Sequence, residues 1–301
     1  QARARGIANL IIINEVERDG AFQHLDDFLS GHDADCQWGG FDERLTAGLC
    51  YTSGTTGDPK GVAYTHRSNT LHALNTIAPD GFALSARDVI LPVVPMFHAN
   101  SWGLAFSGPA VGAKMVMPGP RLDGPSLHDL IEAEGVTFAA GVPTVWQGYV
   151  DHLRDHGITR TELQRVVIGG AACPAALIKA LESLGAQVIH AWGMTELSPV
   201  GLVATPTRSV LALPELEQRE LALKQGRPIG IDARIVDDEG QELPRDGVAV
   251  GILEVRGPAV IERYVGHEKS ALSGDGWFDT GDIASIDALG FVRITDRAKD
   301  I

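Results

Sequence analysis

One strand–helix–strand unit constrains the fold of this chain more than any other feature. A strand is predicted at Arg165–Ile168, a helix that begins at Pro174, and a second strand at Gln187–His190. Proline suits the first helical turn, where its missing N–H group costs nothing. Such a unit implies parallel strands with a right-handed crossover. The sequence therefore predicts an α/β protein with parallel or mixed sheets layered with helices.

Strand and helix patterns alternate through residues 51–200 and change after residue 200. The first part contains predicted strands at Val89–Val94, Lys114–Met117 and Val136–Ala140, and a helix at Ser126–Ala133 closed by Gly135. The later part contains a charged helix at Pro214–Lys224 and period-2 strands at Ala233–Val236, Ile252–Arg256, Ile283–Ile286 and Phe291–Ile294. Residues 1–50 show a strand at Leu10–Ile13 and a helix at Phe22–Leu29. This periodicity predicts an α/β subdomain at 51–200 and a small β-rich subdomain at 201–296.

Charge and composition exclude several classes of protein. The formal net charge is −14, whereas nucleic-acid binders carry a basic footprint. No run of 18 apolar residues is present, so no integral membrane segment is expected, and peripheral membrane contact stays open. Cys36, Cys50 and Cys173 lack metal-site spacing and form no disulfide framework, which favours reduced thiols and a cytoplasmic location.

The segment Tyr51–Gly61, YTSGTTGDPKG, has the composition of a phosphate-binding loop. It combines the hydroxyl groups of Thr52, Ser53, Thr55 and Thr56 with three glycines that let backbone N–H groups approach a ligand, and with the cation of Lys60. It differs from the P-loop of ordinary NTPases because Asp58 and Pro59 separate Gly57 from Lys60. Taken alone, a solvated Ser/Thr/Gly turn is an equally open interpretation.

This loop resembles the signature loop of the acyl-adenylating superfamily, which includes acyl-CoA synthetases, adenylation domains and luciferases. Six further segments resemble that family in its order: MFHANSWG from Met96, GVPTVW from Gly141, IGGAACP from Ile168, HAWGMTE from His190, GWFDTGDIA from Gly276 and DRAKDI from Asp296. The resemblance covers residues 51–301, whereas residues 1–50 match only vaguely.

The resemblance implies a two-step reaction. A carboxylate attacks the α-phosphorus of ATP to give acyl-AMP and pyrophosphate, and the thiol of CoA then displaces AMP. It implies ATP, Mg²⁺ and CoA as cofactors and small-molecule partners, with a fatty acid as the other substrate. A ligase for acyl-AMP transfer or aryl acids and a non-catalytic nucleotide-binding protein are the alternatives.

The resemblance also assigns residues to the triphosphate and its metal. The phosphate-loop residues are Thr52, Ser53, Gly54, Thr55, Thr56, Gly57 and Lys60. Glu196, helped by the Thr52 hydroxyl, would hold Mg²⁺, because a hard cation prefers oxygen ligands. Thr195 would reach a phosphate. Lys60, Thr195, Glu196 and His98 are the predicted catalytic residues, and a plain surface carboxylate is the alternative for Glu196.

Further residues resemble the family's nucleoside contacts. Trp192, between Ala191 and Gly193, would stack on adenine, and Gly170 and Ala171 would line the opposite wall. Asp282 and Arg297 would contact the ribose, and Lys299 would be the hinge of a C-terminal domain. The alternatives without a ligand-binding role are a core tryptophan at Trp192, a helix N-cap at Asp282, a surface ion pair at Arg297 and a solvated Lys299.

The segment from Met96 is most like the fatty-acid branch. His98 resembles the residue beside the acyl carboxylate, and Trp102 resembles an indole that gates the acyl tunnel. A core histidine and a core tryptophan are the respective alternatives. The tunnel would gain about 0.8 kcal/mol for each buried CH₂ group.

The sequence departs from the family at both ends. Residues 1–50 would be a remnant of the first N-terminal subdomain, and residues 297–301 a hinge to a C-terminal domain that the sequence does not contain. That domain would supply a catalytic lysine, so we expect this polypeptide alone to turn over poorly. A homodimer stays open.

Overall fold

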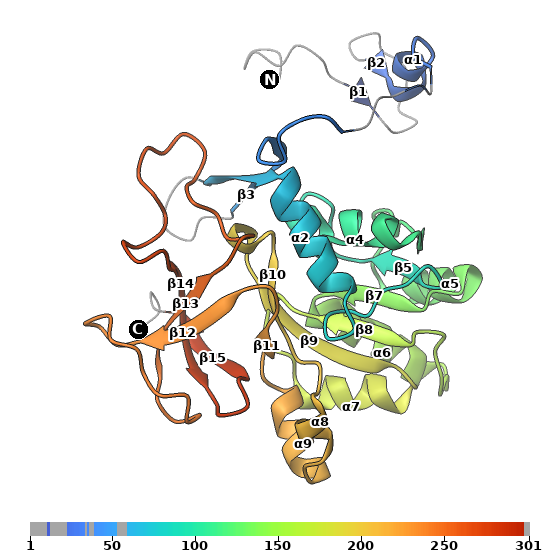
Figure 1. Ribbon diagram of the computed structural model, residues 1–301. Helices are drawn as coiled ribbons and strands as arrows, with labels where there is room; N and C mark the ends of the chain where they lie inside the picture. Colours follow the sequence, from blue (N-terminus) through green and yellow to red (C-terminus); the bar gives the residue numbers. More distant parts are fainter. Residues whose placement is uncertain (1–10, 13–22, 34, 36–38, 53–58, 298–301) are drawn as a thin grey trace. The chain divides into compact units, whose positions relative to one another are not determined.

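The computed structural model describes residues 11–12, 23–33, 35, 39–52 and 59–297 (Figure 1), which fall into two units, Gln1–Asp42 and Glu43–Ile301. In the first unit, β1 (Ile11–Ile12) pairs in parallel with β2 (Gln23–His24), and α1 (Leu25–Leu29) follows. The predicted helix from Phe22 was wrong at its start, because residues 23–24 pair as a strand.

The second unit is built on a seven-stranded sheet in the order β11-β10-β9-β8-β7-β5-β6. Its strands are β5 (Val89–Pro92), β6 (Lys114–Met115), β7 (Phe138–Gly141), β8 (Arg165–Ile168), β9 (Gln187–Gly193), β10 (Val200–Val203) and β11 (Arg227–Pro228). β6, β5, β7, β8 and β9 run parallel to one another. β10 is antiparallel to both of its neighbours, β9 and β11. The predicted α/β class and the parallel pairing of β8 with β9 are confirmed.

Helices cover both faces of this sheet, as Figure 1 shows. One apolar cluster joins Val166 and Ile168 of β8 to α5 (Gly124–Glu134), α6 (Pro143–Asp155) and α7 (Ala175–Ser183). Val167 belongs to a second cluster that contains Leu104 of α4 (Leu104–Val111), and Ile77 of α2 (His66–Ile77) packs against it. Because β8 is buried on both faces, its sequence is a continuous apolar run rather than an alternating pattern.

The start of α5 shows how a cap moves a predicted boundary. The Asp123 carboxylate accepts a hydrogen bond from the Ser126 N–H at 3.0 Å, and Pro125 stands in the first turn. This N-cap satisfies a backbone donor that has no partner within the helix. The helix therefore begins at Gly124 rather than Ser126, and it ends at Glu134, where Gly135 with φ at +63° closes it as predicted.

A second sheet is antiparallel, in the order β12-β13-β14-β15. It comprises β12 (Asp232–Val236), β13 (Gly251–Arg256), β14 (Phe278–Ile286) and β15 (Val292–Arg297), and the predicted β14–β15 hairpin is confirmed. The remaining elements are the hairpin of β3 (Thr46–Tyr51) and β4 (Gly61–Thr65), α3 (Ala99–Trp102), a 3₁₀ helix at Thr195–Leu197, α8 (Arg208–Leu211) and α9 (Glu215–Ala222). Among the described helices, none combines the length and apolar character needed to cross a bilayer.

The double-sided core generates a stability prediction. Leu127 on α5 is fully buried, so Leu127→Ala should lower the free energy of unfolding by about 2–5 kcal/mol, because it removes methyl groups and leaves a cavity. The control Leu216→Ala, on α9 at 70% exposure, should change it by less than about 0.5 kcal/mol. Urea denaturation measures both, and equal effects would contradict this packing.

Candidate active site

The predicted phosphate loop begins and ends at two residues that hydrogen-bond to each other. The Thr52 N–H donates to the Lys60 carbonyl at 3.0 Å, and the Lys60 N–H donates to Thr52 Oγ1 at 3.3 Å. These bonds extend the β3–β4 hairpin to the base of the loop. The predicted phosphate contacts Ser53, Gly54, Thr55, Thr56 and Gly57 lie outside the described residues.

The carboxyl ends of β8 and β9 pack closely against each other. A methyl group on Gly169 would lie 2.7 Å from the Ala191 carbonyl oxygen, so a larger residue does not fit there. Gly170 follows with φ at +77°, a conformation that favours glycine. Gly170, Ala171 and Gly193 are exposed at this edge of the sheet, where ligands of open α/β sheets bind.

Trp192 and Asp282 join the two sheets directly. The indole N–H of Trp192 donates to Asp282 Oδ2 at 3.0 Å, and Asp282 is only 3% exposed. Asp282 lies inside β14, so the helix N-cap alternative is wrong. Its register partner in β15 is Arg297. The side chain of Arg297 and all of Lys299 lie outside the residues that the structure describes. Trp192 is half-buried, which leaves part of its ring available to a ligand.

Glu196 is buried at 7% exposure in the 3₁₀ helix, so the surface-carboxylate alternative is wrong. Its Oε1 accepts a hydrogen bond from the Tyr264 hydroxyl at 2.8 Å. The neighbouring Thr195 carbonyl accepts one from the Tyr64 hydroxyl, also at 2.8 Å. Burial is the main cause that raises the pKa of both phenols, so both remain protonated donors at neutral pH.

The surroundings of Glu196 fit a magnesium ion. In the described part of the chain no ion pair reaches this buried carboxylate, and no group of three His, Cys, Asp or Glu side chains could hold a metal alone. A buried charge requires a partner. Mg²⁺ commonly takes one or two carboxylates and completes its shell with water and substrate phosphates, which matches a single buried Glu196.

The segment that carries His98 and Trp102 has a rare backbone conformation. Ala99, Asn100, Ser101 and Trp102 have φ between 48° and 55°, which makes α3 a left-handed turn. Such residues cost about 1–2 kcal/mol each, and this kind of strain concentrates at functional sites. The Ser101 hydroxyl donates to the Val94 carbonyl and helps to hold the turn.

The two predicted site residues at this turn, His98 and Trp102, differ in their exposure to solvent. His98 is exposed, so the core-histidine alternative is wrong. Trp102 is 8% exposed and belongs to the core cluster of α4 and the sheet. Its ring lies against the glycine pair, 3.2 Å from where a Gly169 methyl group would stand and 3.6 Å from one on Gly170. Trp102 therefore connects the turn to the edge of the sheet.

His72 on α2 was missed by sequence reasoning, because its partner lies 128 residues away. Its Nε2 accepts a hydrogen bond from the Val200 N–H at 2.9 Å, and a methyl group on Gly103 would lie 2.5 Å from its ring. Burial lowers the pKa of His72 to about 3. The neutral ring thus fixes the start of β10 and contacts the end of the left-handed turn.

His72 generates a pH prediction. The pKa is about 6.5 in an unfolded chain and about 3 in the folded one, so the folded state resists protonation. The stability due to neutral His72 should be complete above about pH 6.5 and decrease as pH falls towards 3, because each pKa unit corresponds to about 1.4 kcal/mol. His72→Gln keeps an acceptor for the Val200 N–H and removes this titration.

The measurement is urea denaturation of both proteins between pH 4.5 and 7. The free energy of unfolding should fall less steeply in His72→Gln than in the unchanged chain. His156→Gln, the same change at an exposed position, is the control and should keep the original slope. Parallel curves for the unchanged chain and His72→Gln would contradict the assignment.

The fold is that of an α/β protein, and the predicted site residues Gly170, Ala171 and Gly193 lie exposed at the carboxyl edge of its parallel strands. The model of the family described as "AMP-binding enzyme" matches residues 17–265. The chain therefore belongs to the AMP-binding enzyme family, and the resemblance first seen in its motifs is confirmed.

Individual relatives are similar over most of this chain. It is 51% identical over 278 residues to a medium-chain-fatty-acid–CoA ligase of Ectopseudomonas oleovorans, covering 92% of this chain and 51% of the relative. It is 48% identical over 263 residues to a long-chain-fatty-acid–CoA ligase of Thermus thermophilus, covering 86% of this chain and 49% of the relative. The chain thus spans about half the length of these curated relatives.

Solved structures support the same fold. O-succinylbenzoate coenzyme A synthetase from Bacillus subtilis, in complex with AMP, is 25% identical with a TM-score of 0.78, covering 100% of this chain and 60% of that one. A long-chain-fatty-acid–CoA ligase from Archaeoglobus fulgidus is 28% identical with a TM-score of 0.69, covering 84% of this chain and 51% of that one.

Proposed function

We propose that this chain provides the nucleotide- and acyl-binding part of an ATP-dependent fatty-acid–CoA ligase. The observation that carries the proposal is that Tyr264 contacts both Lys60, near the end of the phosphate-loop segment, and the buried carboxyl group of Glu196. Lys60 Nζ lies 4.8 Å from the centre of the Tyr264 ring, and the hydroxyl of that ring binds Glu196. A cation for phosphates and an oxygen ligand for a metal thus stand on either side of one residue.

The proposed reaction forms acyl-AMP and pyrophosphate from a carboxylate and ATP, and then transfers the acyl group to CoA. A carboxylate is a poor electrophile, and the adenylate supplies its leaving group. Lys60, the loop hydroxyls and Thr195 would bind the phosphates, and Glu196 with Thr52 would hold Mg²⁺. Such an ion would neutralise charge on the departing pyrophosphate.

The nucleoside would bind at the edge formed by β8, β9 and β14. Trp192 would stack on adenine between Ala191 and Gly193, opposite Gly170 and Ala171. Asp282 and Arg297 would contact the ribose. The Trp192–Asp282 hydrogen bond supports this, because it orients the indole beside the carboxylate. We propose Lys299 as the hinge, and a cytoplasmic homodimer as the assembly.

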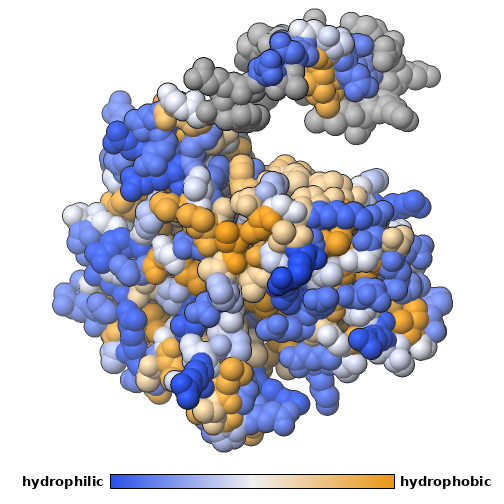
Figure 2. All heavy atoms as spheres, turned by 45° about the vertical axis from the view of Figure 1, so that its right-hand side comes forward, coloured by the Kyte–Doolittle hydropathy of each residue, from blue (hydrophilic) through white to orange (hydrophobic). Residues whose placement is uncertain are grey.

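Two features support a fatty acid as the acid substrate. The relatives at 48–51% identity are medium- and long-chain-fatty-acid–CoA ligases and a 3-methylmercaptopropionyl-CoA ligase, all named for aliphatic acids, whereas a benzoate–CoA ligase of Arabidopsis thaliana is 36% identical. Figure 2 shows apolar atoms on the face that carries α2 and α4, where Leu74, Phe97 and Phe106 are exposed. His98 would meet the carboxylate, and Trp102 would border the acyl chain.

Replacement of Glu196 tests the metal assignment. Glu196→Ala should weaken Mg²⁺-dependent ATP binding by at least about tenfold, because it removes the buried oxygen ligand, and should leave metal-free AMP binding within about twofold. Isothermal titration calorimetry measures both constants. Glu262→Gln, an exposed carboxylate two residues from Tyr264, is the matched control and should bind like the unchanged chain. Unchanged Mg²⁺ dependence in Glu196→Ala would refute the proposed metal site.

A further inference from the structure

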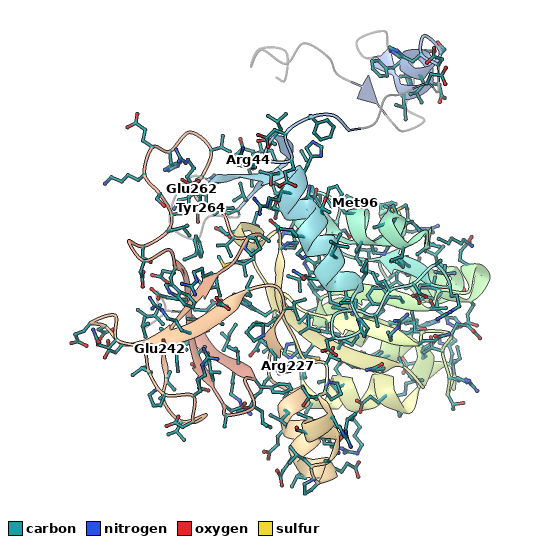
Figure 3. All side chains as sticks on the ribbon, in the orientation of Figure 1. Arg44, Met96, Arg227, Glu242, Glu262 and Tyr264 are labelled. Atoms are coloured by element: carbon teal, nitrogen blue, oxygen red, sulfur yellow. The ribbon has the colours of Figure 1, made fainter. Side chains whose placement is uncertain are left out.

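Tyr264 contacts two of the proposed functional residues from a distant part of the sequence. It lies on the connection between β13 and β14, beside the β3–β4 hairpin (Figure 3), and is 68 residues from Glu196. Its hydroxyl donates to Glu196 Oε1 at 2.8 Å. The face of its ring lies 4.8 Å from Lys60 Nζ, within the range of a cation–π contact.

The backbone on both sides of Tyr264 is held in place. The Ile261 N–H donates to the Glu196 carbonyl at 3.0 Å, and the Val265 N–H donates to the Gly61 carbonyl at 2.8 Å. One bond thus ties the connection to the residue that carries the carboxylate. The other ties it to the residue that follows Lys60, so Tyr264 is fixed between the two groups that it contacts.

The contacts of Tyr264 affect whether Lys60 and Glu196 can pair with each other. A lysine and a glutamate placed near one another tend to form an ion pair, which would occupy both the donors of Lys60 and the oxygens of Glu196. In the described structure no such pair forms. The phenol instead gives the carboxyl group a hydrogen-bond donor and the lysine a neutral π-face, so neither side chain is occupied by the other.

We propose that Tyr264 is a positioning residue that orients Glu196 for the metal, holds Lys60 for the phosphates, and keeps the two charges from pairing with each other. This inference rests on the proposed function. Mg²⁺ demands near-ideal octahedral geometry, so the orientation of its protein ligand matters, and loss of a group that orients a ligand weakens metal binding.

Two substitutions separate the hydroxyl from the ring. Tyr264→Phe removes the donor to Glu196 and keeps the ring under Lys60, whereas Tyr264→Leu removes both. Calorimetry of ATP binding to the whole chain over a Mg²⁺ series measures the half-saturating Mg²⁺ concentration. This should rise about tenfold in Tyr264→Phe, with metal-free ATP binding within about twofold. Tyr264→Leu should weaken metal-free ATP binding as well.

Tyr149→Phe is the matched control. The Tyr149 hydroxyl is also buried and hydrogen-bonded, to Thr161 Oγ1 at 2.6 Å, but it lies on α6 within the helical core. Its removal should lower thermal stability without changing the Mg²⁺ requirement. A purely structural role for Tyr264 would produce this same pattern in Tyr264→Phe and would overturn the inference.

A double substitution tests whether Tyr264 acts through Glu196. In a Glu196→Ala background, Tyr264→Phe should add no further change in Mg²⁺ dependence, because residues that act on one ligand are non-additive. An additive effect would overturn the inference and leave the proposed function standing. Absence of Mg²⁺-dependent ATP binding by the unchanged chain would overturn the proposed function and this inference together.

Discussion

One apolar cluster holds together three of the segments that carry the candidate site. It contains Val62 and Tyr64 of the β3–β4 hairpin, Leu197 after β9, and Leu253 and Val255 of the second sheet. All five side chains are fully buried. Because Lys60, Glu196 and Asp282 belong to or adjoin these segments, burial of these side chains determines which of these polar groups meet. The hydrogen bonds then refine positions that packing has already set.

The sequence predicted the elements whose pattern is local. The bounds of β8 agree fully because a short apolar run between polar residues has few alternatives, and α5 was two residues too short at its start because its Asp123 cap was overlooked. β14 extends five residues further towards its N-terminus than predicted. Gly281, with φ at +70°, interrupts the alternation there, and the register shifts near it.

The site was predictable only in part, because only some of its contacts follow from a local sequence pattern. Glycine-bearing strand ends in a strand–helix–strand unit must meet at one edge of a parallel sheet, so the placement of Gly169 beside Ala191 follows from periodicity. His72 and Tyr264 give no local signal, because their partners are distant in sequence and each looks like an ordinary core or loop residue. The left-handed turn at Ala99–Trp102 was also beyond prediction, since non-glycine residues rarely adopt it.

Charge explains why so many neutral groups surround the site. The formal charge of −14 gives the chain no long-range attraction for a nucleotide, so attraction must arise within about 8–10 Å, where ionic screening is incomplete. At that range each charged side chain contributes to binding. An ion pair between Lys60 and Glu196 would leave neither group available to a ligand. The Tyr64 and Tyr264 phenols are protonated at neutral pH, with pKa values that burial raises further, and burial keeps His72 neutral, so these rings position charged and backbone groups without cancelling any charge. This acidic protein thus keeps the cation of Lys60 and the carboxyl group of Glu196 in contact with one neutral residue, Tyr264, instead of with each other.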